Sequence, residues 1–117
     1  MLMPARNSKL LAPGDPAPLE MLGSPEAHPI ALVCEHAGQA IPRMLGDLGV
    51  TRAALDSHIG WDIGAAEVTR RLAACLGAPA ALQPYSRLVI DCNRPPDAPD
   101  AVPETSDGVA VPGNRGD

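Results

Sequence analysis

A short apolar run at residues 30–34 constrains the fold of this 117-residue chain more than any other stretch. The run (IALVC) carries no charge, which is typical of a strand buried on both faces, although periodicity alone also permits a helix core. It ends at Glu35 and His36, and Gly38 and Pro42 then disfavour an immediate helix start. In open α/β sheets, ligands bind beyond the carboxyl ends of strands, so this carboxylate and imidazole form a candidate site.

Charge and hydropathy exclude several classes of protein. The net charge is −5, and the nine Lys and Arg residues do not form a basic face for nucleic acid. No apolar run approaches the length of a bilayer span, and the N-terminus lacks the apolar core of a secretory signal. The three cysteines, Cys34, Cys75 and Cys92, lie inside predicted elements. We therefore expect a cytoplasmic protein that binds neither membrane nor nucleic acid.

Proline and glycine divide the chain into a patterned middle and two irregular ends. The sequence has 14 Pro and 11 Gly, and these cluster toward both ends. Residues 1–29 are predicted to be a disordered, Pro-rich leader with at most a short turn near residues 19–22. Residues 30–117 are predicted to be the structured part, with an irregular segment from Asn93 onward. The sequence thus predicts one small domain.

The clearest helix is predicted at residues 63–76. Its apolar face comprises Ala65, Val68, Leu72, Cys75 and Leu76. Asp62 is expected as the N-cap and Gly77 as the stop. Shorter helical turns are predicted at residues 41–48 and 52–57, the second capped by Thr51.

Two further strands are predicted after this helix. Residues 79–83 form a weak strand and residues 87–92, with Leu88, Val89 and Ile90, a strong one. The first strand, the helix and the next strand make a βαβ unit, and the last strand is expected to return as a hairpin. Because a parallel sheet needs cover on both faces and only one long helix is found, we interpret the chain as the front part of a larger α/β domain.

Four stretches stand in a distinctive order. They are VCEHAGQAIP at 33–42, HIGWDIGAA at 58–66, YSRLVIDCNR at 85–94, and VPETSDG with VPGN within 102–114. In this order they resemble the N-formylglutamate amidohydrolase family over roughly residues 30–114, the N-terminal part of that family. The resemblance implies an α/β fold similar to the zinc-dependent exopeptidases. For this chain it implies a partial, truncated three-layer sandwich with a mixed sheet.

The resemblance also implies a metal site. His36 is the best candidate for a Zn²⁺ ligand, because a neutral imidazole at a strand end is a rigidly mounted donor; the alternative is a hydrogen-bonded structural histidine. Asp62 is the candidate second ligand, or only a helix cap. The later part of family members is expected to supply a further histidine ligand, and no histidine follows His58 here.

Other candidate residues surround these two. Glu35 would orient His36 or act as general base, and His58 would be a ligand, a substrate contact or an ordinary loop residue. Near the third strand, Arg87, Asn93 and Arg94 are candidate contacts for substrate carboxylates, which guanidinium groups bind in bidentate fashion. The alternative for Arg87 is an ion pair with Asp91 that braces the strand. The turn at residues 104–107 either folds over the pocket or belongs to a solvated tail.

The resulting prediction is a metal-dependent hydrolase of the amide bond in an N-formyl or N-acyl amino acid, a small-molecule substrate such as N-formylglutamate. Zinc would polarise the formyl carbonyl and activate water. The alternative is a truncated, inactive fragment or a non-catalytic interaction domain. The sequence has no Gly-rich phosphate loop, no Cys-x-x-Cys pair and no nucleophile elbow, which argues against nucleotide, redox and serine-hydrolase chemistry.

Overall fold

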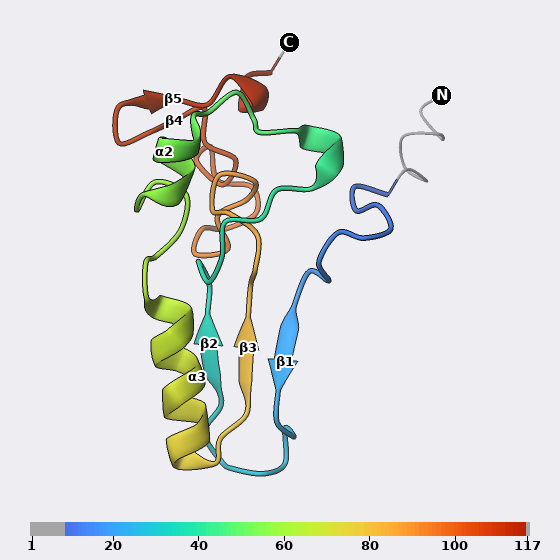
Figure 1. Ribbon diagram of the computed structural model, residues 1–117, viewed down its shortest axis with the longest axis vertical. Coiled ribbons are helices and arrows are strands. Elements are labelled where there is room, and N and C mark those ends of the chain that lie inside the picture. Colours follow the sequence, from blue (N-terminus) through green and yellow to red (C-terminus); the bar gives the residue numbers. More distant parts are fainter. Residues whose placement is uncertain (1–8, 117) are drawn as a thin grey trace.

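A small mixed sheet organises the computed structural model, which describes residues 9–116 (Figure 1). Its strands are β1 (Glu20–Leu22), β2 (Leu32–Cys34) and β3 (Ala80–Leu82), in the order β1-β3-β2. β2 pairs with β3 in parallel, and β1 pairs with β3 antiparallel. The predictions of an α/β protein and of a mixed sheet are confirmed.

The predicted βαβ unit is present, and α3 (Ala65–Leu76) connects β2 to β3. The helix packs on one face of the sheet through its small residues. The core there comprises Cys34, Ala37, Ala73, Ala80 and Leu82, flanked by Leu22, Leu32, Ala65 and Ala66. Alanine side chains let the helix backbone approach the strands closely. Gly77 ends the helix in the left-handed conformation, φ 67°, as predicted.

Most of the predicted apolar face of this helix is exposed, and of its residues Ala65 packs against the core of the sheet. Val68, Leu72 and Leu76 are 58 %, 46 % and 46 % exposed, and Cys75 is exposed as well. The alanines of the helix, and not its larger apolar side chains, make the contact with the sheet. Asp62 is also not the N-cap: that position belongs to Gly64, and the Asp62 carboxylate points elsewhere.

The predicted strong strand at residues 87–92 does not form. The backbone turns there instead, with Val89 N–H donating to the Ser86 carbonyl (3.0 Å) and Leu88 N–H to Ser86 Oγ (3.1 Å). Leu88 is fully buried in a second core, which draws the chain away from the sheet. The expected hairpin is wrong for the same reason, and the segment predicted as weak supplies the central strand β3.

The predicted leader contributes to the fold. Glu20–Leu22 forms β1, so the expectation of a disordered segment is wrong for these residues. Glu20 accepts two hydrogen bonds from Arg70 of α3, at 2.6 and 2.7 Å, and the Tyr85 hydroxyl donates to the Pro16 carbonyl. Residues 1–8 of the predicted leader lie outside the described residues.

A cap of short elements lies beyond the carboxyl ends of β2 and β3 (Figure 1). The elements are η1 (Arg43–Leu45), α2 (Arg52–Asp56), β4 (Thr105–Ser106), β5 (Val109–Ala110) and η2 (Pro112–Asn114). Their shared core comprises Leu48, Val50, Leu55, Ile59, Leu88 and Val111. Thr51 caps α2 as predicted, accepting from the Ala54 N–H at 3.1 Å. The hairpin β4–β5 stands where the sequence predicted an irregular segment.

The three-layer sandwich is present only in part. Within residues 9–116, α3 covers one face of the sheet, whereas Met21 and Val33 on the other face are 54 % and 71 % exposed. No helix in the described part of the chain is long and apolar enough to cross a membrane. The fold thus provides a sheet, one helical layer and a cap at the strand ends.

Candidate functional site

His36 lies just beyond β2, buried between two carboxylates. Its Nε2 is 2.7 Å from Asp91 Oδ1, and its Nδ1 is 3.0 Å from Asp62 Oδ2. The backbone reinforces this meeting, because the Asp62 N–H donates to the His36 carbonyl at 2.9 Å. The first two of the four stretches that carry the family resemblance, around His36 and Asp62, therefore meet at one point.

Arg87 completes this cluster. Its Nη1 lies 3.1 Å from Asp62 Oδ1 and its Nη2 3.5 Å from Asp91 Oδ2, so one guanidinium links both carboxylates that hold His36. The alternative of an Arg87–Asp91 pair is thus present, but it braces the site and not a strand. The backbone N–H of Arg87 also donates to the Gly60 carbonyl at 3.2 Å.

The donor set of the cluster can accommodate a cation. Carboxylate oxygens only accept hydrogen bonds when ionised, whereas a neutral imidazole has a single N–H. Asp62 and Asp91 also accept from Arg87, so it is the contact between His36 Nδ1 and Asp62 Oδ2 that needs either a proton or a cation between the two atoms. With a neutral imidazole, the two carboxylates outweigh the one guanidinium of Arg87 by one negative charge. A cation between His36 Nδ1 and Asp62 would bridge these two facing atoms and would cancel the excess negative charge.

Asp91 is the residue that the sequence analysis did not assign to the site. Burial by itself would raise the pKa of Asp91, but the hydrogen bond from His36, the Asn93 N–H and the Arg87 charge outweigh it, so the pKa is lowered. A signal for Asp91 was available, since it follows an apolar triplet just as His36 follows residues 30–34. The predicted strand at that triplet obscured it.

The cluster fits part of a zinc site. Two donors on one tetrahedral zinc, with bonds of about 2.0–2.2 Å, lie about 3.0–3.5 Å apart. His36 Nδ1 and Asp62 Oδ2 match this separation at 3.0 Å, while Asp91 on Nε2 would fix the ring. However, no three His, Cys, Asp or Glu side chains within residues 9–116 are grouped as a metal site. The described residues thus offer two suitable ligands and no full set.

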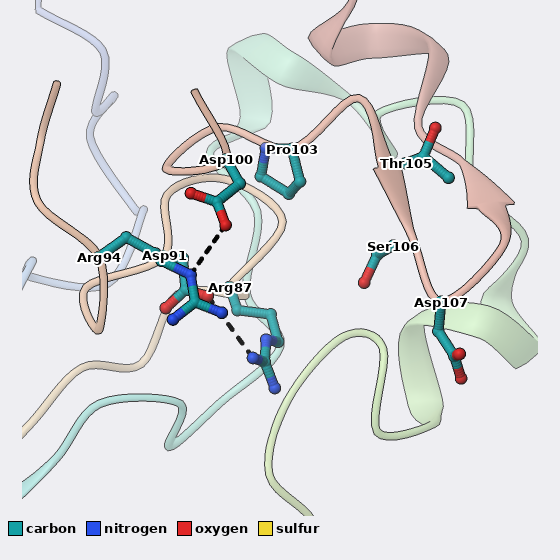
Figure 2. Close-up of a pocket in the computed structure, with 8 residues that line it drawn as sticks. All are labelled: Arg87, Asp91, Arg94, Asp100, Pro103, Thr105, Ser106 and Asp107. Atoms are coloured by element: carbon teal, nitrogen blue, oxygen red, sulfur yellow. Dashed lines mark hydrogen bonds and ion pairs between the residues drawn. The ribbon is translucent and has the colours of Figure 1, made fainter. Parts of the chain in front are cut away.

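A pocket of about 200 Å³ adjoins this cluster (Figure 2). Its lining residues are Arg87, Asp91, Arg94, Asp100, Pro103, Thr105, Ser106 and Asp107. Figure 2 shows the two guanidinium groups across the pocket from Ser106 and Asp107 of the β4–β5 hairpin. The 104–107 turn therefore folds over the pocket. Arg94 is held through Nε by Asp100 at 3.0 Å, which leaves its two terminal amino groups to meet a ligand.

His58 pairs with Asp107, a lining residue of this pocket, and does not join Asp62. It is exposed, and its Nε2 lies 2.8 Å from Asp107 Oδ2. Gly60, in the linker of residues 58–62, is buried. Its carbonyl accepts from Ser86 Oγ at 2.7 Å, and a Cβ would lie 2.0 Å from the Leu55 carbonyl oxygen. Because Gly60 packs this closely against Leu55 and its carbonyl also accepts from the Arg87 N–H, the linker holds Asp62 in place relative to Arg87.

Glu35 and Asn93 are less engaged than predicted. Glu35 is exposed and lines an open hollow together with Asp62 and Val33, whereas both nitrogens of the neighbouring His36 are occupied by Asp62 and Asp91. Asn93 contributes its backbone N–H to Asp91 Oδ1 at 2.9 Å, and its side chain is exposed. The structure therefore groups His36, Asp62, Asp91 and the arginines, and leaves these two at the margin.

An α/β domain with a buried histidine–carboxylate cluster and an arginine-lined pocket at its strand ends has the arrangement of an enzyme or small-ligand domain. The chain belongs to the N-formylglutamate amidohydrolase family, whose sequence profile matches residues 28–117. None of the curated proteins matches the sequence.

One solved structure with this fold is gene product Atu2144 from Agrobacterium tumefaciens. It is 39 % identical to this chain and superposes with a TM-score of 0.84 over 90 % of it. The present chain spans only 42 % of that protein.

Proposed function

We propose that the site hydrolyses the amide bond of an N-formyl or N-acyl amino acid, with N-formylglutamate as the first substrate to test. The observation that carries this proposal is the 3.0 Å approach of His36 Nδ1 and Asp62 Oδ2 beside a pocket lined by Arg87 and Arg94. Such a site combines metal-ligand donors with groups that bind carboxylates. The family membership supports the same chemistry.

His36 and Asp62 would hold the metal ion, and Asp91 would keep the imidazole oriented from its other nitrogen. Zinc, when bound, would supply Lewis-acid polarisation of the scissile carbonyl and activation of water. Further ligands would have to come from polypeptide other than residues 9–116, because no group of three is found there. Glu35 lines the same hollow as Asp62, which supports it as the group that accepts a proton from the attacking water.

Arg94 would bind the substrate carboxylate. Its Nε is taken by Asp100, so the two terminal amino groups provide the parallel donors that a carboxylate matches. Arg87 would act less as a substrate clamp than as a brace, since Asp62 and Asp91 already occupy it. His58 and Asn93 remain proposals as substrate contacts; for His58 the support is its contact with Asp107, which lines the pocket.

A second candidate is that this chain does not catalyse by itself and serves as a non-catalytic interaction domain. Two observations favour it: the incomplete ligand set within residues 9–116, and the 42 % of the Agrobacterium protein that the chain spans. A metal held by two protein ligands should exchange rapidly.

The two candidates are separated by zinc content after dialysis and by formate release from N-formylglutamate. If the chain is a hydrolase, it retains about one zinc per chain and releases formate, and His36→Ala abolishes both. His28→Ala is the matched control, because His28 lies outside the cluster and only accepts from the Ile30 N–H at 3.0 Å. Loss of zinc on dialysis together with no formate would support the non-catalytic alternative.

A further inference from the structure

β2 has a free edge. It is the last strand in the order β1-β3-β2, so its other side has no strand partner among the described residues. Leu32 N–H and the Cys34 carbonyl both bond toward β3, at 2.9 Å each. In a parallel ladder the bonding direction alternates from residue to residue, so the N–H and carbonyl of Val33 point away from β3. An unpaired edge of this kind is ready to accept another strand.

Apolar side chains flank this edge on both faces of the sheet. On the face away from α3, Met21 and Val33 both align with Ala81 across the three strands. On the side of α3, Val33, Ile63 and Val68 line the apolar part of one open hollow, whose polar part includes Glu35 and Asp62. Ile63 is 65 % exposed. The edge of β2 thus lies at the centre of one apolar surface, the β2 surface, formed by Met21, Val33, Ile63, Val68 and Ala81.

The exposed β2 surface has the features of an interaction site. Isolated exposed apolar residues are common, but a contiguous apolar surface beside an open strand edge marks an interaction site. Parallel strands are also normally covered on both faces of their sheet, whereas here α3 covers one.

The length of the Agrobacterium protein indicates the occupant. That protein shares this fold over 90 % of the present chain. The match covers 42 % of the Agrobacterium protein, so more than half of that protein is unmatched. We propose that the β2 surface binds a segment homologous to the unmatched part of that protein. The segment would add a strand to the edge of β2 and place an apolar helix over Met21, Ala81 and Val33. The β2 surface lies apart from the arginine-lined pocket and borders Glu35 and Asp62 in their shared hollow, and binding of the segment can be measured without any hydrolysis.

Co-expression tests the proposal. This chain, carrying an affinity tag, is produced with the unmatched segment of gene product Atu2144, and the purified material is analysed by native mass spectrometry. The expected result is a 1:1 complex in which the Val33 amide exchanges with deuterium at least about a hundredfold more slowly than in the chain alone. Val33→Lys should lower the recovery of the segment at least about tenfold, since Val33 is exposed in the chain alone and the variant should fold.

Met44→Lys is the matched control, because Met44 is 62 % exposed but lies in η1 of the cap. Equal recovery of the segment with Val33→Lys, or a stable homodimer that excludes the segment, would overturn the proposal. If the segment is insoluble by itself, a fusion that joins it after this chain decides the question. A Val33 amide that exchanges as fast in the fusion as in the chain alone would likewise overturn the proposal.

Discussion

His36 Nδ1 lies 3.0 Å from Asp62 Oδ2, although the two residues are 26 positions apart in the chain. The contact results from the topology: β2 delivers His36, and the linker before α3 delivers Asp62 to the same end of the sheet. It is further fixed by the bond from the Asp62 N–H to the His36 carbonyl. Because this second bond uses only backbone atoms, side-chain variants can test the chemistry while the placement is retained.

Asp62→Asn should weaken zinc binding by at least about tenfold, because an amide oxygen replaces the anionic donor that faces His36 Nδ1. The size and the backbone bond of residue 62 are kept, so the fold should persist. Isothermal titration with zinc measures the change, and Asp56→Asn, on the exposed side of α2, is the control. Equal zinc affinity in Asp62→Asn and the parent would exclude Asp62 as a ligand.

Asp91→Asn should destabilise the fold by about 1.5–3 kcal/mol, because the buried carboxylate accepts from His36, the Asn93 N–H and Arg87, and an amide cannot keep all of these bonds. The pKa of Asp91 is lowered in the folded chain, so its ionised form favours folding. This contribution is complete above the ordinary aspartate pKa of about 3.9 and is lost as the pH falls through the lowered value. Urea unfolding at pH 7 and at pH 3 measures this contribution: the difference in the free energy of unfolding between parent and variant should be smaller at pH 3. The same difference in the free energy of unfolding at both pH values would argue against an ionised Asp91.

Arg94→Ala should weaken binding of N-formylglutamate by about tenfold or more, since the proposed carboxylate clamp is lost. Arg94→Lys should restore only part of the affinity, because an ammonium group lacks the planar pair of donors. Arg52→Ala, which removes an exposed ion pair with Asp56, is the control. Titration with glutarate separates binding from hydrolysis; if Arg94→Ala binds glutarate as well as the parent does, Arg94 is not the clamp.

Much of the site could be predicted from the sequence because its residues follow local signals. His36 stands after an apolar strand, and Asp62 stands before a helix that Gly77 ends. The role of Asp91 was missed, because Leu88, Val89 and Ile90 have the composition of a strand while tertiary packing of Leu88 makes them a turn. β1 was missed because three residues between prolines carry little periodicity, and only pairing with β3 makes them a strand.

The face of α3 shows a different limit of sequence patterns. Periodicity identified Val68, Leu72 and Leu76 correctly as one apolar stripe, but it does not say which partner that stripe meets. The alanines on the neighbouring face fill the contact with the sheet in this chain. A stripe that is apolar and exposed is consistent with a further layer of structure next to α3.

Gly60→Ala should destabilise the fold by about 1–3 kcal/mol, which is typical of overpacking at a close backbone contact. The added Cβ would lie 2.0 Å from the Leu55 carbonyl oxygen, so the linker or α2 must move. That movement would also shift the Gly60 carbonyl, to which Ser86 Oγ and the Arg87 N–H are bonded, and would thereby loosen Arg87 from Asp62. Urea unfolding measures the loss of stability, with Gly116→Ala as the control because no atom lies within 4 Å of its added Cβ. Parent-like stability of Gly60→Ala would show that the linker is as flexible as its glycine content suggests.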